Sequence, residues 1–124
     1  MTTTKRILVV DDEESLTFSL YKIFIQADSD YEVLTASSGE EAWGKISEQP
    51  FDLVVTDISM PGMSGLELLE KIKKHSPNTT VIVMTAFFDE FNKEEAIAKG
   101  AKHFIEKPFE IKKMRNLVVE TLEN

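Results

Sequence analysis

The sequence predicts an α/β protein in which a parallel sheet of five strands is covered by helices on both faces. Short apolar runs alternate along the chain with longer stretches whose apolar residues recur every three or four positions. The first pattern is typical of strands buried on both faces, and the second of amphipathic helices. Because the two patterns alternate and short connections join them, the strands are expected to be parallel and the sheet doubly wound.

The first three elements are expected near the N-terminus. Residues 6–10 (RILVV) form a short, β-branched run that predicts a strand. The helix expected after it carries one apolar stripe, composed of Leu16, Leu20, Ile23, Phe24 and Ala27. Residues 31–36 (YEVLTA) predict a second strand, and their more polar composition favours a place at the edge of the sheet.

Two helices are indicated by the same N-terminal pattern, with a strand between them. Ser38 precedes Glu41 by three residues, and Ser64 precedes Glu67 by the same distance, which is the spacing of a capping box. The buried run of residues 51–57 (FDLVVTD) predicts the third strand. The apolar residues of the two helices are Ala42, Trp43 and Ile46 in the first, and Leu66, Leu69 and Ile72 in the second. Residues 76–78 (SPN) are expected to end the second helix.

The last elements follow the same alternation. Residues 80–85 (TVIVMT) form the segment most typical of a strand. A shorter helix is expected over residues 90–99, because Gly100 is a usual C-terminal stop. Residues 103–107 (HFIEK) predict a brief fifth strand. A final amphipathic helix is marked by Ile111, Met114, Leu117, Val118 and Leu122.

Composition limits the domain organisation and the class of protein. The chain has 124 residues, which is one domain's worth of sequence and too little for two ordinary domains. No repeat, low-complexity segment or linker divides it, so residues 1–124 are predicted to form a single domain without an output domain. The hydrophobic share of 42% argues against disorder. The absence of cysteine excludes disulfides and thiolate metal sites.

Charge and hydropathy exclude two kinds of partner. The formal net charge of −8 argues against direct binding of nucleic acid, which usually needs a basic surface. No apolar run approaches the roughly 18 residues of a membrane span, so membrane insertion is not expected. The N-terminus reaches acidic residues after a very short apolar run and therefore does not resemble a signal peptide. A cytoplasmic location is the expectation.

Chemically active residues stand where the predicted strands end. Asp11 and Asp12 follow the first strand, Asp57 ends the third, Thr85 ends the fourth and Lys107 ends the fifth. The carboxyl ends of parallel strands meet at one edge of the sheet, where ligands bind at the point at which the strand order reverses. These side chains are therefore expected to converge on one crevice.

Such a set of residues is suited to phosphoryl transfer. Carboxylates held close together repel one another and need shared protons or a cation. Mg2+ is a natural solution, because it prefers oxygen ligands and keeps several waters. Lys107 and the hydroxyl of Thr85 can hold the oxygens of a phosphoryl group. Asp57 is then the expected nucleophile, which attacks phosphorus to give an acyl phosphate.

The motifs together resemble a known family. The pair Asp11–Asp12, Asp57 within DISMPGMSG, the MTA of residues 84–86 and the KPF of residues 107–109 are similar to the receiver domains of bacterial two-component response regulators, such as chemotaxis and sporulation receivers. The resemblance covers essentially the whole chain. It implies a flavodoxin-like (βα)5 fold with strand order 2-1-3-4-5, and a switch activated by phosphorylation rather than a turnover enzyme.

The resemblance also assigns roles to single residues. Asp57 accepts the phosphoryl group from a histidine kinase or a histidine phosphotransfer protein. Asp57 and Asp12 bind Mg2+ or Mn2+ directly, Asp11 acts on the metal through water, and the main-chain carbonyl of Ser59 is a further ligand. Thr85 and Lys107 contact the phosphoryl oxygens. The peptide bond from Lys107 to Pro108 is expected to be cis, which only X-Pro bonds adopt at low cost.

The same resemblance implies a switch and an output surface. The hydroxyl of Thr85 is expected to move toward the phosphoryl group, and Phe104 to enter the space that it leaves. The fourth helix, fifth strand and last helix form the expected signalling face, with Lys99, Lys102, Glu106, Lys112 and Arg115 on it. This basic excess favours an acidic downstream protein, an output domain of the same protein, or a second copy in a homodimer formed on phosphorylation.

Two residues are expected to set the lifetime of the acyl phosphate. Ser59 stands two residues after Asp57, and Phe87 stands two residues after Thr85. In this fold, these two positions flank the route of a water molecule that attacks the acyl phosphate. A bulky side chain at Phe87 would shield the acyl phosphate and slow its hydrolysis.

Other functions are consistent with parts of the pattern. A lone aspartate at a strand end is more often a helix cap or turn residue than a nucleophile, and only its companions argue otherwise for Asp57. An aspartyl phosphatase usually carries a second acid two residues after the nucleophile, where this chain has Ser59. A receiver-like binding module that is never phosphorylated would not need the complete set. A flavodoxin-like cofactor carrier would need a phosphate-binding loop after the first strand, which is lacking.

Overall fold

A computed structural model describes residues 4–87 and 89–123, and these form strands and helices in the predicted alternation. The strands are β1 (Lys5–Val10), β2 (Tyr31–Ala36), β3 (Leu53–Asp57), β4 (Thr80–Thr85) and β5 (His103–Glu106). The helices are α1 (Glu14–Ala27), α2 (Gly39–Glu48), α3 (Gly65–His75), α4 (Glu90–Ala98) and α5 (Ile111–Glu123). None of the helices in this part of the chain combines the length and the apolar character that crossing a membrane requires.

The strands form one parallel sheet in the order β2-β1-β3-β4-β5. The predicted strand order is thus confirmed, and β2 lies at an edge as its polar composition indicated. From β1 the chain passes to β2 on one side and then to β3 on the other, so the order reverses between β1 and β3. Ligand crevices of such sheets lie at the carboxyl ends of the strands on either side of this reversal.

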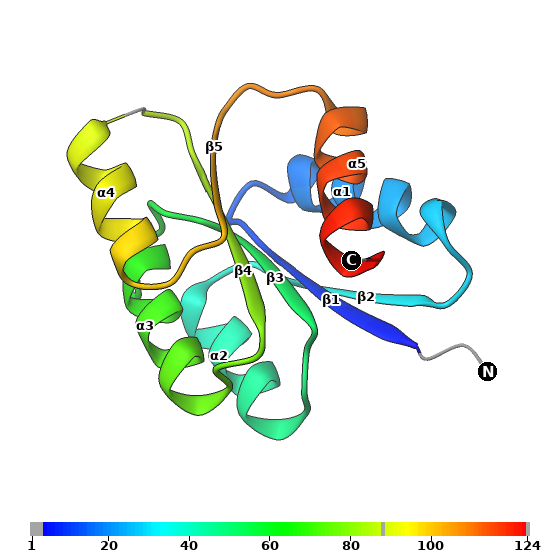
Figure 1. Ribbon diagram of the computed structural model, residues 1–124, viewed down its shortest axis with the longest axis horizontal. Helices are drawn as coiled ribbons and strands as arrows, with labels where there is room; N and C mark the ends of the chain where they lie inside the picture. The colour runs from blue at the N-terminus through cyan, green and yellow to red at the C-terminus, as the bar shows by residue number, and fades with distance from the viewer. Residues whose placement is uncertain (1–3, 88, 124) are drawn as a thin grey trace.

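Helices cover both faces of the sheet and enclose two separate cores. Figure 1 shows α1 and α5 on one face and α2, α3 and α4 on the other. Neighbouring residues of a strand point to opposite faces, so Ile7 and Val9 pack with α1 and α5, while Leu8 and Val10 pack with the other three helices. This two-sided burial explains why the strands read as continuous apolar runs.

Two strand boundaries differ from the predicted ones. β3 begins at Leu53 rather than residue 51, because the main-chain N–H of Arg6 donates to the carboxylate of Asp52 (2.8 Å) instead of to a main-chain carbonyl. β5 ends at Glu106 rather than residue 107. The N–H of Lys107 still donates to the carbonyl of Thr85 (2.7 Å), but the next residue is Pro108, which has no N–H to continue the ladder.

The two predicted capping boxes have different outcomes. At α3 the box is complete, with the Ser64 hydroxyl accepting from the Glu67 N–H (3.2 Å) and the Glu67 carboxylate accepting from the Ser64 N–H (3.5 Å). At α2 the prediction is wrong in its second half. Ser38 accepts from the N–H of Glu41, but the Glu41 carboxylate binds the N–H and hydroxyl of Ser37 (2.7 and 2.9 Å). Ser37 offers two donors to one carboxylate oxygen, and these hydrogen bonds lower the pKa of Glu41.

A tyrosine connects the edge of the sheet to the last helix and makes stability depend on pH. The Tyr31 hydroxyl donates to the Glu123 carboxylate (3.0 Å), and burial together with this carboxylate raises the pKa of Tyr31 to about 12. The unfolded chain ionises this tyrosine near pH 10, so stability is fully present below about pH 10 and falls as the pH rises toward 12. We expect a loss of about 1–2 kcal/mol, reduced by the solvent around Glu123. Denaturant midpoints measured across this range should show it, and Tyr31→Phe should remove this component.

Candidate functional site

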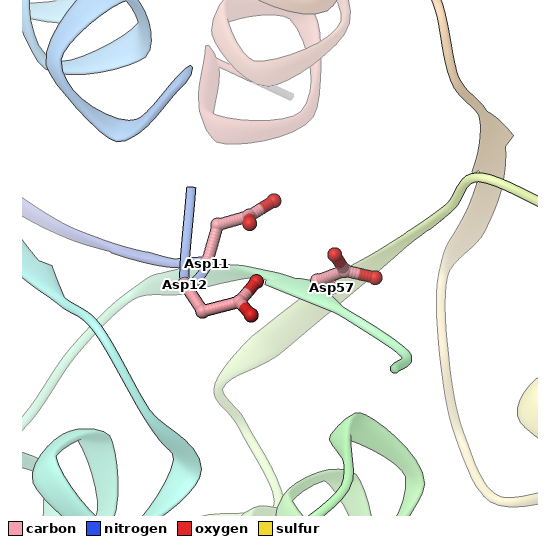
Figure 2. A group of neighbouring side chains, drawn as sticks. All are labelled: Asp11, Asp12 and Asp57. Carbon is pink, nitrogen blue, oxygen red and sulfur yellow. The ribbon is translucent and has the colours of Figure 1, made fainter. Parts of the chain in front are cut away.

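Three carboxylates gather at the edge of the sheet where the strand order reverses. Asp11 directly follows β1 and Asp57 is the last residue of β3, and these two strands are neighbours. One carboxylate oxygen from each of Asp11, Asp12 and Asp57 lies within 4.8 Å of the other two, and Figure 2 shows the three side chains at this edge. Asp11 and Asp57 are buried, with 1% and 7% of their surface exposed, whereas Asp12 is open to solvent. The predicted convergence of these residues is therefore present.

A single ammonium group connects two of the acids. Lys107, in the loop after β5, donates from Nζ to Asp11 Oδ2 (2.7 Å) and to Asp57 Oδ2 (2.9 Å). Its side chain is only 15% exposed, so both ion pairs are largely shielded from water. The peptide bond from Lys107 to Pro108 is cis. Lys107 thus occupies the place in the crevice at which the sequence predicts a fixed positive charge.

Main-chain groups hold the remaining carboxylate oxygens. Asp11 Oδ1 accepts from the N–H of Glu13 (2.9 Å), and Asp57 Oδ1 accepts from the N–H of Ser59 (3.1 Å). Each buried acid therefore has one oxygen bound to Lys107 and the other to an amide two residues further along the chain. These contacts fix the orientation of both carboxylates before any ligand arrives.

The environment shifts the ionisation of the central pair. Burial raises the pKa of Asp57, and this effect outweighs the hydrogen bonds from Lys107 and from the N–H of Ser59, which lower it. Burial alone would lower the pKa of Lys107, but its hydrogen bonds to Asp11 and Asp57 raise that pKa overall. The ionised carboxylates therefore favour the charged form of the lysine.

The charge of the cluster leaves room for a divalent cation. With all groups ionised, three carboxylates and one ammonium leave a local charge of −2 among Asp11, Asp12, Asp57 and Lys107. Oxygen donors of this kind are the ligands of Mg2+, which binds to one or two carboxylates and keeps several waters. Because Asp12 is exposed beside the two buried acids, the donor set is accessible from solvent. The residues present fit the predicted metal.

Thr85 lies at the end of the neighbouring strand, but its hydroxyl faces its own loop. It is 2% exposed, and its hydroxyl donates to the carbonyl of Phe87 (3.0 Å) and accepts from the N–H of the same residue (3.1 Å). The strand register places Asp57 opposite Met84, next to Thr85. The threonine therefore holds the start of the β4–α4 loop, and no described contact joins its hydroxyl to the acids.

The two aromatic residues of the predicted switch and shield differ in exposure. Phe104 is half-buried, packs against the core under α2, α3 and α4, and pairs with Val83, two residues before Thr85 in β4. Residues two apart on a strand share a face, so Phe104 lies on the same side of the sheet as Thr85. Phe87 is 80% exposed. Only its main chain contacts Thr85 in the described hydrogen bonds.

One residue that positions Asp57 has no side chain. A Cβ atom at Gly65 would lie 2.1 Å from the Asp57 carbonyl oxygen and 2.7 Å from the Cα of Ile58. The N–H of Gly65 donates to the Ile58 carbonyl (2.9 Å), which draws the first turn of α3 onto the end of β3. Only glycine permits this approach.

Substitution of Gly65 tests the importance of this contact. We expect Gly65→Ala to lower the free energy of unfolding by about 2–3 kcal/mol, because two backbone segments must separate. Gly44 is the matched control, since it lies within α2 and nothing lies within 4 Å of its added Cβ. Gly44→Ala should instead raise stability by about 0.5–1 kcal/mol through helix propensity. Urea denaturation of both variants decides the matter, and equal stabilities would contradict this account.

The structure also shows a contact that the sequence gave no reason to expect. The carboxylate of Glu40, at the start of α2, accepts a hydrogen bond from the main-chain N–H of Met63 in the β3–α3 loop (2.8 Å). In the sequence Glu40 is one of two adjacent acids in the first turn of a helix, a pattern that the helix dipole explains without any partner. The capping-box spacing marks Glu41, but no local pattern indicates a partner for Glu40.

The expected basic excess on the signalling face is smaller than predicted. The ammonium of Lys99 is paired with the carboxylate of Glu70 on α3 and lies 3.9 Å from that of Glu95. These contacts direct Lys99 toward α3 and offset its charge. Lys102, Lys112 and the exposed acid Glu106 are open to solvent, so the face carries mixed charge.

Comparison with known proteins is consistent with this geometry. Residues 7–119 match the family described as the response regulator receiver domain. The chemotaxis protein CheY of Thermotoga maritima is 41% identical over 107 residues, which cover 86% of this chain and 88% of that protein. Among solved structures, a CheY-like response regulator receiver domain protein from Methanospirillum hungatei has a TM-score of 0.91 at 33% identity, covering 98% of this chain and 95% of that one.

Another relative is considerably longer than the match. The alkaline phosphatase synthesis transcriptional regulatory protein PhoP of Bacillus subtilis is 38% identical over 106 residues, which cover 85% of this chain but 43% of that protein. The match thus spans less than half of that regulator. The family match, the strand order and the cluster of acids with its lysine lead to one conclusion: this chain belongs to the receiver domain family of two-component response regulators.

Proposed function

We propose that this receiver domain takes a phosphoryl group onto Asp57 in a reaction that depends on Mg2+ or Mn2+, and thereby changes the surface that it offers to a partner. The proposal rests on the buried Asp57 carboxylate. Its oxygens accept hydrogen bonds from Lys107 Nζ (2.9 Å) and from the N–H of Ser59 (3.1 Å). A carboxylate held in this way is preorganised for attack and has a cation beside it for the incoming charge.

The proposed step transfers a phosphoryl group between two side chains. A carboxylate oxygen of Asp57 forms a bond to phosphorus while the bond from phosphorus to the histidine nitrogen of the donor breaks. The electron pair of that bond remains on the imidazole, and the product is an acyl phosphate. Lys107 is placed to hold one phosphoryl oxygen. The hydroxyl of Thr85 would hold another after leaving Phe87.

The metal would be held by residues of the same cluster. Asp12 and Asp57 are the direct ligands in this proposal, Asp11 acts through water, and the main-chain carbonyl of Ser59 adds a further oxygen. A bound divalent ion offsets the repulsion between the carboxylate and the phosphoryl oxygens. The local charge of −2 around these acids supports the assignment.

Hydrolytic turnover and a module without phosphorylation are less well supported. Ser59 stands two residues after Asp57, where an aspartyl phosphatase usually has its second acid. A module that is never phosphorylated would have no use for two buried acids held by one partly buried lysine, an arrangement with a desolvation cost. We therefore propose a switch that assists its own phosphorylation and dephosphorylation but is not a turnover enzyme.

The proposed switch couples Thr85 to Phe104. When the hydroxyl of Thr85 turns to donate to a phosphoryl oxygen, both of its hydrogen bonds with the main chain of Phe87 are lost. The β4–α4 loop is then released. Phe104 lies on the same face of the sheet and is half-buried, so it can move into the space beside Thr85. The outcome is a changed surface over α4, β5 and α5.

Partners and location follow as proposals from the same chemistry. The phosphodonor is a histidine kinase or a histidine phosphotransfer protein. The downstream partner is another protein, an output domain of the same protein or, on phosphorylation, a second copy, each contacting the face of α4, β5 and α5. Direct binding of nucleic acid is not proposed, given the net charge of −8. Insertion into a membrane is not proposed because no apolar run in the sequence approaches the length of a span. The proposed location is the cytoplasm.

A small-molecule phosphodonor tests the proposed function. The intact protein should gain one phosphoryl group from acetyl phosphate with Mg2+ and none after chelation of the metal. Mass spectrometry of the peptide that contains Asp57 locates the group, and hydroxylamine should remove it, because acyl phosphates are sensitive to that nucleophile. A group on any other residue, or equal labelling without metal, would overturn the proposal.

The lifetime of the acyl phosphate is proposed to depend on Phe87. Its ring is 80% exposed while the hydroxyl of Thr85 holds its main chain, so release of that main chain lets the ring approach the site. We expect Phe87→Ala to shorten the half-life of the phosphorylated protein about two- to fivefold, because water then reaches the acyl phosphate more easily. Phe91→Ala, which removes another exposed ring (73%), is the control. An unchanged half-life in Phe87→Ala would remove this role.

A further inference from the structure

We infer that Glu40 is a positioning residue for the metal-binding loop, and that α2 thereby sets how strongly the receiver binds Mg2+. The inference rests on the proposed function, because it concerns the loop that carries Ser59. It concerns a carboxylate outside the acidic cluster, in a helix that contributes no ligand. The structural basis is the hydrogen bond from the Met63 N–H to Glu40 Oε2, at 2.8 Å.

The β3–α3 loop, residues 58–64, is held at both of its ends. The N–H of Ile58 donates to the Met84 carbonyl (2.8 Å), and the N–H of Gly65 donates to the Ile58 carbonyl (2.9 Å). Ser59 lies just inside the first of these contacts and donates to Asp57. Between these ends Met60 is buried in the core under α2, α3 and α4 and Met63 packs against that core, whereas the turn at Pro61 and Gly62 is exposed. Its geometry there depends on what it contacts outside the loop.

The start of α2 supplies that contact. A Cβ atom at Gly39 would lie 2.8 Å from the Met63 carbonyl oxygen and 2.9 Å from the Met63 Cβ, so the helix and the loop approach closely only because residue 39 is glycine. Glu40, the next residue, accepts the N–H of Met63. Two adjacent residues of α2 thus bind one residue of the loop, by packing and by a hydrogen bond.

The loop is shaped to receive this carboxylate. Gly62 has a φ of +77°, a conformation that favours glycine, and an added Cβ would lie 2.6 Å from Glu40 Oε2. The turn at Gly62 therefore presents the next N–H to Glu40 without a side chain between them. Without the carboxylate, the N–H of Met63 would bind water, and only the packing of Met60 and Met63 against the core would hold the turn.

The consequence concerns the energy of metal binding. A loop that is already ordered loses little entropy when its carbonyl binds an ion, whereas a loose loop must be ordered at that moment. We expect Glu40→Ala to weaken Mg2+ binding about fivefold, the effect of one solvent-accessible hydrogen bond. Glu40→Gln should retain most of the affinity, because its amide oxygen can accept the same N–H.

At saturating Mg2+, phosphorylation of Glu40→Ala should proceed at the wild-type rate, so the defect lies in metal affinity and not in the chemical step.

The neighbouring acid provides a matched control. Glu41 has the same charge, lies on the same turn of α2 and is also exposed, but its carboxylate binds Ser37 instead of the loop. Glu41→Ala removes the same charge and the same interaction with the helix dipole. It should leave Mg2+ affinity unchanged.

Two measurements without phosphorylation decide the question. The first is a Mg2+ titration followed by the amide NMR signals of Asp57 and Ser59, and the second is hydrogen exchange at the Met63 amide in metal-free protein, which should accelerate in Glu40→Ala alone. Unchanged affinity in Glu40→Ala, an equal loss in Glu41→Ala, or unchanged exchange at Met63 would each overturn the inference. If the wild type itself shows no saturable Mg2+ binding at these signals, the proposed function fails, and that result is distinct from the other three.

Discussion

Asp57→Asn is expected to lower Mg2+-dependent phosphorylation by acetyl phosphate at least about 100-fold, because an amide oxygen is a far weaker nucleophile than a carboxylate. The change is nearly isosteric, and the amide oxygen can still accept the N–H that Ser59 donates at 3.1 Å. Loss of phosphorylation should therefore come without loss of folding. Quantitative mass spectrometry of the intact protein measures the yield, and circular dichroism checks the fold.

A second aspartate near the same strand provides the control for this experiment. Asp52 precedes β3 at the opposite end, and its carboxylate accepts from the main-chain N–H of Arg6 (2.8 Å). Asp52→Asn keeps an acceptor at that place and removes the same charge. It should be phosphorylated at the wild-type rate. If Asp57→Asn is phosphorylated as readily as Asp52→Asn, the acceptor is another residue.

Removal of the lysine is expected to impair both chemistry and stability. In Lys107→Ala the two ion pairs at 2.7 and 2.9 Å are lost, and two buried carboxylates face each other without their cation. We expect phosphorylation to slow about 100-fold, as when one charge-stabilising donor is removed from an active site. The free energy of unfolding in metal-free buffer should fall by about 2 kcal/mol, less than for a fully buried pair because the site is partly open to solvent. Urea denaturation measures this loss.

Mg2+ should distinguish the electrostatic part of the stability loss from lost packing. An ion that binds the native acidic cluster stabilises the folded state by mass action, so Mg2+ should raise the stability of Lys107→Ala more than that of the wild type. Lys102→Ala, which removes an exposed lysine of the same charge, should change neither stability nor phosphorylation by a measurable amount. If Mg2+ stabilises Lys107→Ala no more than the wild type, repulsion between Asp11 and Asp57 is not the cause of the defect.

The fold was predictable because its determinants are local or periodic. The apolar run at residues 80–85 and the helical stripe at residues 111–122 each identify an element without knowledge of the rest of the chain. The convergence of Asp11, Asp57 and Lys107 followed from the same pattern, because the ends of parallel strands meet at one edge. For these residues, position in the sequence determines position in space once the topology is known.

The contacts that were missed depend on the meeting of elements far apart in sequence. Glu40 and Glu41 are adjacent and chemically identical, yet one binds Met63 in a distant loop and the other binds Ser37. Lys99 was expected to contribute to a basic face, but Glu70 on a different helix takes its ammonium group. Side-chain packing between elements determines which partner each of these residues contacts, and the periodicity of the sequence does not predict that partner.

The span of the lysine contacts has a consequence for synthesis of the protein. Lys107 lies 96 residues after Asp11 and 50 residues after Asp57. A ribosome therefore delivers both acids well before the cation that neutralises them, and domains fold largely as units once their sequence has emerged. A nascent chain that ends before Lys107 therefore lacks the cation that the folded acidic cluster requires. We expect the receiver to become competent for phosphorylation only when its C-terminal part has left the exit tunnel, which keeps unfinished chains out of the signalling pathway.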